Sequence, residues 1–338
     1  MSAPSAALQA LRDLPGVRRA WPGKHGELVL ERHDDQGRLR AGQIAPDGTV
    51  TMVGFATDPR LPALEPPARG ELVVHRLGRR AVVLEPERAV KILRPGRAPA
   101  VAEVTAALAQ RCAAAGLGAA QVVSATPDTL STTLLPGRTL HDLGAAGRPG
   151  WEVLLERWPT LASQEDTSLS AHGPAQEAQV LEHWLSLVRE HGALEPVEAL
   201  GQQVNQVRQE LLEGRADPYV LLHRDLHDKQ LLWDGRTLSV LDMDTAARGE
   251  AALDLGNLLA HLRLRVLQGM LPAALAQELR PRLRDLAADL GASPSRLALY
   301  TRAAALRLAC VYAFRPSSAS WMPRWLEEHL DARAPQQD

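Results

Sequence analysis

Short stretches that alternate apolar with polar residues, or that are rich in β-branched residues, fill most of the first 135 positions and predict β-strands. A short helix over residues 1–13 precedes them, and a proline-rich linker, Asp58–Pro67, divides them. Turn clusters such as Asp34–Gly37 and Pro46–Gly48 make the first group a three-stranded meander. The strands are expected at Glu27–Glu31, Leu39–Ile44, Val50–Phe55, Glu71–Arg76, Arg80–Glu85, Arg88–Leu93, Ala120–Ala125 and Leu130–Leu135.

Helical spacing dominates from about residue 140 onward. One helix is also expected earlier, among the strands, at Pro99–Ala115, with Gly116 after its end. Two short strands, Leu231–Trp233 and Leu238–Leu241, interrupt the helical part. The helices of that part are expected at Glu177–Glu190, Pro196–Glu213, Ala252–Gln268, Pro272–Leu290, Pro294–Phe314 and Trp321–Asp331. The sequence therefore predicts an α+β protein with a β cap over residues 1–66, a small β-rich lobe over 67–136 and a large helical lobe over 137–338.

Composition narrows the function classes. A chain of 338 residues is long enough for two or three domains or for one bilobal enzyme. Its formal net charge of -2 provides no basic field, so nucleic acid is not an expected partner. No apolar run is long enough for a membrane span, and the N-terminal residues lack the features of a secretory signal, so we expect a cytoplasmic protein. Two cysteines, Cys112 and Cys310, cannot form a disulfide framework or a metal cluster by themselves.

The segment Leu221–Asp244, LLHRDLHDKQLLWDGRTLSVLDMD, carries the chemistry. An apolar strand end leads into His223 and Asp225, Gln230 follows five residues later, and Asp242 ends the next strand. Carboxylate and amide oxygens are hard ligands of the kind that Mg²⁺ prefers. A further free carboxylate can accept the proton of an attacking hydroxyl group. This order of residues suits a site for ATP and magnesium.

This segment resembles the catalytic loop of the aminoglycoside phosphotransferase and choline kinase-like family, which has the bilobal protein-kinase-like fold. The family pattern is His-x-Asp-x-x-x-x-Asn followed by a strand that ends in Asp, and His223, Asp225 and Asp242 match it. Gln230 stands where the family has Asn; it keeps the carbonyl oxygen on a side chain one methylene longer. The resemblance covers residues 70–330 and leaves the first 66 unexplained.

The resemblance also implies residues in the small lobe. A lysine is expected on its third strand to contact the ATP phosphates, and Lys91 matches this in a chain with only three lysines. Its implied partner is Glu103 on the following helix. The turn around Gly78 would cover the phosphates, although it lacks the full Gly-x-Gly-x-x-Gly pattern. The backbone near Leu135 would form the hinge that reads adenine.

Taken together, the resemblance implies in-line transfer of the γ-phosphoryl group of ATP to a small-molecule hydroxyl. Asp225 would be the base, His223 would brace the loop, and Gln230 and Asp242 would hold magnesium. The resemblance also makes Asp254 a structural residue that steadies this loop.

Other residues of the segment admit two readings. Asp244 either lies in the outer shell of the metal or caps the following turn. Asp228 and Lys229 are expected to be solvated loop residues, with contact between Lys229 and the γ-phosphate as the alternative. His223 and His227 are four residues apart, yet a zinc site lacks a third ligand there.

The acceptor is expected to be small, because only eleven residues separate Asp242 from Asp254 and leave no room for a peptide-docking segment. Residues 141–215 contain twelve acidic residues against five arginines, an excess that favours a cationic acceptor such as an aminoglycoside or amino sugar. Solvated helix faces explain the same excess, and a neutral sugar or alcohol stays open. The aromatic residues Phe314, Trp321 and Trp325 either line the pocket or pack in the core.

Two other function classes compete with the enzyme. One is a nucleotide-binding regulator, a pseudokinase with little or no transfer, which Gln230 and the glycine-poor turn favour. The other is an interaction module whose first 66 residues bind a protein partner.

Overall fold

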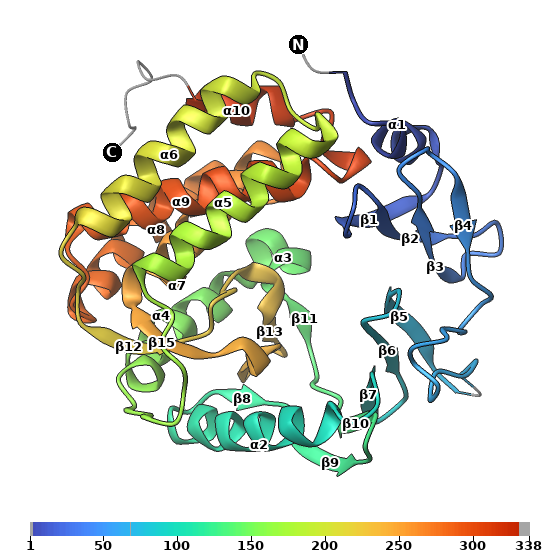
Figure 1. Ribbon diagram of the computed structural model, residues 1–338. Helices are drawn as coiled ribbons and strands as arrows, with labels where there is room; N and C mark the ends of the chain where they lie inside the picture. Colours follow the sequence, from blue (N-terminus) through green and yellow to red (C-terminus); the bar gives the residue numbers. More distant parts are fainter. Residues whose placement is uncertain (1–2, 68, 331–338) are drawn as a thin grey trace.

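The computed structural model describes residues 3–67 and 69–330. Its first part is a cap made of helix α1 (Ala6–Asp13) and a four-stranded antiparallel sheet (Figure 1). The strands lie in chain order: β1 (Val17–Pro22), β2 (Leu28–His33), β3 (Leu39–Ile44) and β4 (Val50–Met52). The predicted meander corresponds to β2–β4. Strand β1 was not expected, because Arg18 and Arg19 interrupt its apolar pattern, and its pairing with β2 carries an irregularity at the same place.

The second part, the N-lobe, is a five-stranded antiparallel sheet in the order β5-β6-β7-β10-β9, with helix α2 (Ala98–Ala114) against it. Strand β7 is central in this sheet, and Lys91 on it pairs with Val82 on one side and Leu130 on the other. The strands are β5 (Glu71–Arg76), β6 (Arg80–Leu84), β7 (Arg88–Leu93), β9 (Val122–Ala125) and β10 (Thr129–Thr133). All five were predicted, with shifts of a few residues at their ends.

The third part, the C-lobe, is mainly helical. Its helices are α3 (Leu140–Leu143), α4 (Arg148–Ala162), α5 (Pro174–His191), α6 (Val197–Glu213), α7 (Ala251–Leu267), α8 (Ala273–Asp289), α9 (Pro294–Tyr312) and α10 (Met322–Leu330). Helix α4 was missed because Pro149, Gly150 and Pro159 lie within its sequence and are typical helix breakers. The predicted end of the last helix, Asp331, lies outside the described residues. The α+β class, with an antiparallel N-terminal region and a helical C-terminal region, is confirmed.

Short strands inside the C-lobe hold the segment that carries the chemistry. One small sheet joins β11 (Arg138–Thr139), β13 (Leu231–Trp233), β14 (Leu238–Val240) and β8 (Gly118–Ala119). A second pairs β12 (Tyr219–Leu222) with β15 (Ala247–Glu250). The loop from His223 to Gln230 runs from one sheet to the other, so both of its ends are fixed by strand pairing.

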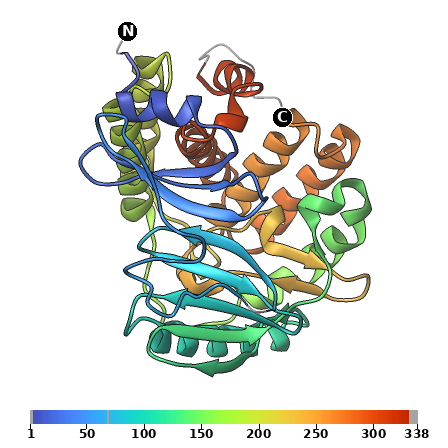
Figure 2. The same cartoon turned by 90° about the vertical axis from the view of Figure 1, so that its right-hand side faces the viewer.

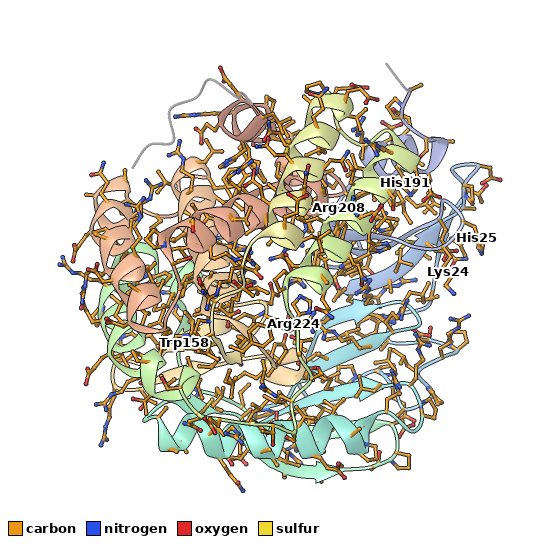
Figure 3. All side chains as sticks on the ribbon, turned by 60° about the vertical axis from the view of Figure 1, so that its left-hand side comes forward. Lys24, His25, Trp158, His191, Arg208 and Arg224 are labelled. Carbon is orange, nitrogen blue, oxygen red and sulfur yellow. The ribbon has the colours of Figure 1, made fainter. Side chains whose placement is uncertain are left out.

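The cap touches both lobes. In Figures 1 and 2, α1 lies beside the C-lobe helices, whereas the cap sheet continues toward β5 of the N-lobe. The Ser5 N–H donates to the carbonyl of His191 at the end of α5 (2.9 Å), and Figure 3 shows His191 next to the cap. On the other side, the buried carboxylate of Glu31 accepts the N–H of His75 (3.1 Å). The cap therefore connects the two lobes at the side away from the β10–β11 crossing.

The three aromatic residues for which the sequence left two alternatives pack inside the C-lobe. Phe314 and Trp325 are fully buried, Trp321 is nearly so, and the indole N–H of Trp325 donates to the carbonyl of Ala305 (3.1 Å). Core packing is therefore the correct alternative for these three side chains. Among the described residues, no helix combines the length and the apolar character needed to cross a bilayer.

Candidate active site

His223 is the anchor of the loop that follows β12. Its ring is completely buried. The Nε2–H donates to the carbonyl of Leu241 (2.7 Å), and Nδ1 accepts the N–H of Asp225 (3.3 Å). One neutral tautomer satisfies both bonds, so neither nitrogen is free to exchange a proton with a substrate. His223 thus positions the backbone of Asp225 relative to the strand that ends at Asp242.

Asp254 fixes the same loop from behind. This carboxylate lies in the first turn of α7 and accepts the backbone N–H groups of His223 (2.6 Å) and Arg224 (2.8 Å). Burial raises its pKa, with a partial offset from His223 and the two N–H bonds. Arg224, near the centre of the molecule in Figure 3, adopts a left-handed backbone conformation with φ 73°. Such a conformation is strained for arginine, and the two bonds from Asp254 hold it.

Asp225 points away from this bracing. About half of its side chain is exposed (50%). The nearest ion-pair partner among the described residues is His227, whose Nε2 lies 3.7 Å from a carboxylate oxygen. Because Nδ1 of His227 accepts the Lys229 N–H (3.1 Å), its proton is on Nε2, directed at Asp225. An exposed carboxylate on a rigid loop can orient and deprotonate an incoming hydroxyl group.

The prediction that Asp228 is solvated is wrong. Asp228 is buried and receives two hydrogen bonds from the Arg265 guanidinium (2.7 and 3.0 Å) and one contact from His141 Nδ1 (3.0 Å). Burial alone would raise its pKa, but His141, His227 and Arg265 together hold the pKa well below its usual value. Asp228 therefore ties the loop to α3 and α7. Lys229 is exposed, as expected.

The side chains of His227, Asp228 and His261 come close enough to suggest a metal site. However, Nη2 of Arg265 bonds to both Asp228 (3.0 Å) and His261 Nδ1 (3.2 Å). A guanidinium group in that position repels a metal ion and occupies the ligand atoms. His261 instead stacks on His227 with ring centroids 4.4 Å apart. These contacts therefore argue against a metal ion at His227, Asp228 and His261.

Gln230 and Asp242 are brought together by the strand pairing. The N–H of Leu241, the residue before Asp242, donates to the backbone carbonyl of Gln230 (2.8 Å). Asp242 has φ 50°, and 42% of its side chain is exposed. Burial of the site raises the pKa of Asp242, but Lys91 and Arg80 outweigh this and lower it. The donor set therefore fits Mg²⁺, which would be held by the amide oxygen of Gln230 and the carboxylate of Asp242.

Lys91 joins this group, but with a partner that differs from the prediction. Its Nζ lies 2.9 Å from Asp244 Oδ2 and 3.3 Å from Asp242 Oδ1, so the lysine faces the C-lobe. Glu103 is exposed on α2 and forms no ion pair with Lys91 in the part of the chain that the structure describes. The two acids lie nearer to Lys91 in this conformation and supply the negative charge expected from Glu103. Asp244 is a lysine partner, and its side chain forms no capping hydrogen bond to the described residues of the following turn.

Gly78 occupies the β5–β6 turn, with φ 63° that suits glycine. Its N–H donates to the carboxylate of Asp58 (2.6 Å), which also contacts His75 Nε2 (3.3 Å). Asp58 comes from the linker predicted only to connect the cap with the N-lobe. In this conformation the turn predicted to cover the phosphates is therefore bonded to the linker through the N–H of Gly78.

Leu135 lies in the segment that crosses from β10 in the N-lobe to β11 in the C-lobe. Before it, the Leu134 N–H donates to the carbonyl of Glu87 (3.0 Å). After it, Gly137 has φ 99° and packs against the backbone of Trp233, where a Cβ would lie 2.5 Å from the carbonyl oxygen. Both flanks of Leu135 are therefore fixed, and its contact with adenine stays a prediction.

The sequence reading missed the cations behind and beside the loop. Arg265 and His261 are four residues apart on α7, whose sequence AALDLGNLLAHLRLRVL is mostly apolar. Polar residues at that spacing on a buried helix are expected to have partners, and this signal could have identified them. Arg80 influences Asp242 across the cleft, and nothing in its local sequence distinguishes it from the neighbouring arginines.

Comparisons with known proteins agree with this architecture. An amicoumacin kinase in complex with AMP-PNP, Ca²⁺ and Ami is 14% identical, with 80% of this chain and 90% of that one covered and a TM-score of 0.59. A choline/ethanolamine kinase family protein from Mesorhizobium loti is 13% identical, with 78% of this chain and 86% of that one covered and a TM-score of 0.52. An aminoglycoside phosphotransferase in complex with AMP-PNP and hygromycin B is 12% identical, with 78% of this chain and 93% of that one covered and a TM-score of 0.53. These likenesses show the bilobal protein-kinase-like fold.

No curated protein sequence matches the chain significantly. The profile of the phosphotransferase enzyme family (APH) matches residues 67–300, which include the N-lobe, the catalytic loop and most of the C-lobe helices. Since this match spans well over half of the sequence, the chain belongs to the phosphotransferase enzyme family.

Proposed function

We infer that the protein is an ATP- and Mg²⁺-dependent kinase that transfers the γ-phosphoryl group to a hydroxyl group of a small molecule. The observation that carries this proposal is the contact of Lys91, on the central N-lobe strand, with Asp242, which follows β14. His223 bonds both to Leu241, the residue before Asp242, and to the backbone of Asp225, so it links the braced loop to this pair. Phosphoryl transfer needs positioning and charge neutralisation more than covalent chemistry, and these residue types supply both.

Each residue has a distinct part in the proposed reaction. Asp225 accepts the proton of the acceptor hydroxyl group as its oxygen attacks the γ-phosphorus, and ADP is the leaving group. Lys91 exchanges its carboxylate partners for the phosphates of ATP. Gln230 and Asp242 would hold Mg²⁺, which neutralises phosphate charge when bound. Leu135 and its neighbours would contact adenine at the hinge.

The acceptor is the open part of the proposal. The acidic excess of residues 141–215 favoured a cationic acceptor, but the structure neutralises much of it locally. Four of these acids pair with arginines from outside the segment, namely Glu152 with Arg282, Asp166 with Arg111, Glu177 with Arg307 and Glu210 with Arg302. Aminoglycosides and amino sugars therefore enter an acceptor screen on equal terms with neutral and anionic compounds.

A reducing, cytoplasmic setting accords with this proposal, because ATP is available there. Both cysteines are free and buried, and burial raises the pKa of each thiol to about 12. Such thiols stay protonated and react slowly.

The test is ADP formation by the full-length protein with Mg²⁺–ATP and a panel of hydroxyl compounds: an aminoglycoside, glucosamine, choline, glucose, glucuronate and glucose 6-phosphate. We expect acceptor-dependent ADP formation that Asp225→Asn slows by about 10²–10⁴-fold. Magnesium-dependent ATP binding without turnover on any acceptor would instead support the pseudokinase, which the replacement of the family's Asn by Gln230 favours.

A further inference from the structure

Besides Arg224 on the catalytic loop itself, two cations near the loop form no ion pair with a carboxylate among residues 3–67 and 69–330. One is Lys229, which lies two residues after His227 and is exposed. The other is Arg315, which follows α9 and precedes the short helix η4 (Pro316–Ser318). Most other arginines of the C-lobe interior are paired with acids, as Arg265 is with Asp228 and Arg296 with Glu250. Cations without a carboxylate partner are therefore a minority among the described residues of the C-lobe interior.

Arg315 is held in place without being neutralised. Its guanidinium carbon lies 4.3 Å from the centroid of the Tyr312 ring, a cation–π contact. Its backbone is fixed at both ends, because its N–H donates to Tyr312 (3.0 Å) and its carbonyl accepts from Ser318 (2.9 Å). Its Nε is buried and has no hydrogen-bond partner in the described part of the chain. A buried donor without a partner costs free energy, so an acceptor atom from a ligand would restore it.

Most of the charges around Arg315 are positive. The guanidinium groups of Arg265 and Arg315 outweigh burial and lower the pKa of Tyr312. Lys229 adds to this effect on the pKa of Tyr312, so it lies within electrostatic reach of the same ring. The nearest buried acid, Asp228, is already occupied by Arg265 and His141. The local field is therefore positive and has no internal counterion to spare.

The cap adds to the same field. Strand β1, which carries Arg19, lies beside η4. Burial lowers the pKa of Arg19, and Glu31 offsets part of this effect. The nearby cations Arg18, Arg315 and Arg80 lower it further. Arg19 shares the buried carboxylate of Glu31 with Arg18, so one acid serves two arginines. A segment of the cap that the family match leaves out thus contributes charge next to Arg315.

We propose that Arg315 and Lys229, with Arg19 of the cap beside them, bind an anionic group of the acceptor, so that the preferred substrate is a hydroxyl compound carrying a carboxylate or a phosphate. The proposal rests on the proposed function, since it assigns these residues to the acceptor side of Asp225. The nucleotide side has its own cation, Lys91, and the carboxylates Asp242 and Asp244. Guanidinium groups bind both carboxylates and phosphates through paired N–H donors.

The test is calorimetric binding to the full-length protein with the nucleotide site filled by Mg²⁺–AMP-PNP. The probes are glucose, glucosamine, glucuronate and glucose 6-phosphate, and inorganic phosphate serves as a probe without a sugar. We expect at least one anionic probe to bind tenfold or more tightly than its neutral or cationic counterpart. The glucuronate and glucose 6-phosphate arms show which anion is preferred. Arg315→Met should remove this difference and leave the affinity for Mg²⁺–AMP-PNP within twofold of the original.

The matched control is Arg236→Met, which changes an exposed arginine on the β13–β14 turn and should alter neither affinity. Equal binding of charged and uncharged probes, or anion binding that survives Arg315→Met, would overturn the proposal. Phosphate binding is also measured without nucleotide in Arg315→Met and Lys91→Met. Loss in Lys91→Met alone places the anion on the nucleotide side and overturns the proposal. Absence of Mg²⁺–AMP-PNP binding contradicts the proposed function. The phosphate measurement does not depend on that result, because it shows whether Arg315 or Lys91 binds the anion.

Discussion

The two faces of the catalytic loop differ in how completely their polar groups are satisfied. On the rear face, His223, Asp228 and Asp254 are buried and each makes at least two hydrogen bonds to the surrounding chain. On the front face, Asp225 is half exposed, and Lys229 has no ion-pair partner in the described chain. The rear face is therefore built for rigidity, whereas the front face keeps its charges available for ligands.

The comparison teaches which acids carry the chemistry. Six aspartates lie between residues 225 and 254, and burial divides four of them into two groups. Asp228 and Asp254 are buried and brace the loop, whereas Asp225 and Asp242 have partly exposed side chains that face the cleft. Substitutions on the front face should therefore reduce turnover with little effect on folding. Substitutions on the rear face should reduce stability.

The largest effect is expected for Asp225→Asn. Removal of a general base lowers kcat by about 10²–10⁴-fold, and the exposed side chain contributes little to folding. Steady-state rates and a thermal melt of the same preparation measure both quantities. A variant that keeps near-normal turnover, or that melts well below the original protein, would break the distinction between the two faces.

Asp228→Asn should be the most destabilising rear-face change. It leaves the buried Arg265 guanidinium without its counterion, which typically costs about 3–5 kcal/mol. Denaturant titration measures the free energy of unfolding, and Asp285→Asn, on an exposed position of α8, is the control. An unchanged free energy of unfolding would show that Asp228 is not a brace.

Asp254→Asn should cost less, about 1–3 kcal/mol, because an amide can still accept one of the two backbone N–H bonds. The NH₂ group of the new asparagine would then face the other backbone N–H, and two donors cannot form a hydrogen bond. The same titration detects the loss, and kcat should fall with it because Arg224 loses support for its left-handed conformation. Full stability combined with full activity would remove Asp254 from the bracing.

Rear-face burial also predicts a pH dependence of stability. Burial, His227 and Arg265 hold the pKa of His261 well below its ordinary value, so the unfolded chain binds a proton that the folded chain does not. Stability should therefore fall as the pH drops below about 6.5, by at most about 1.4 kcal/mol per pH unit for one histidine. His261→Gln should flatten the slope of melting temperature against pH between 7 and 5. His33→Gln, at an exposed position, should not; equal slopes in all three proteins would contradict the account.

The smallest effect is expected for Gln230→Asn. Both side chains offer a carbonyl oxygen, and the backbone bond from Leu241 to residue 230 is unaffected by the change. Turnover should stay within a few-fold, as steady-state rates at two magnesium concentrations would show. Complete loss of activity would mean that the pocket requires the longer side chain.

The order of elements and the residues of the loop were predictable, because alternation and helical spacing follow from burial on one face. His223, Asp225, Gln230 and Asp242 could be found because they lie within one short segment. The partner of Lys91 could not be predicted from the sequence, because Asp244 is 153 residues away and only the arrangement of the lobes brings the two side chains together. Arg315 and Asp58 were missed for the same reason, because long-range contacts give them their surroundings.

The most direct test of the central claim is calorimetric binding of AMP-PNP, with and without Mg²⁺, to the original protein, Asp225→Asn and Asp242→Asn. The account predicts magnesium-dependent binding that Asp225→Asn retains within twofold and Asp242→Asn weakens by at least tenfold. Absence of nucleotide binding, or equal affinity in all three proteins, would contradict the assignment of this cleft as a phosphotransferase active site.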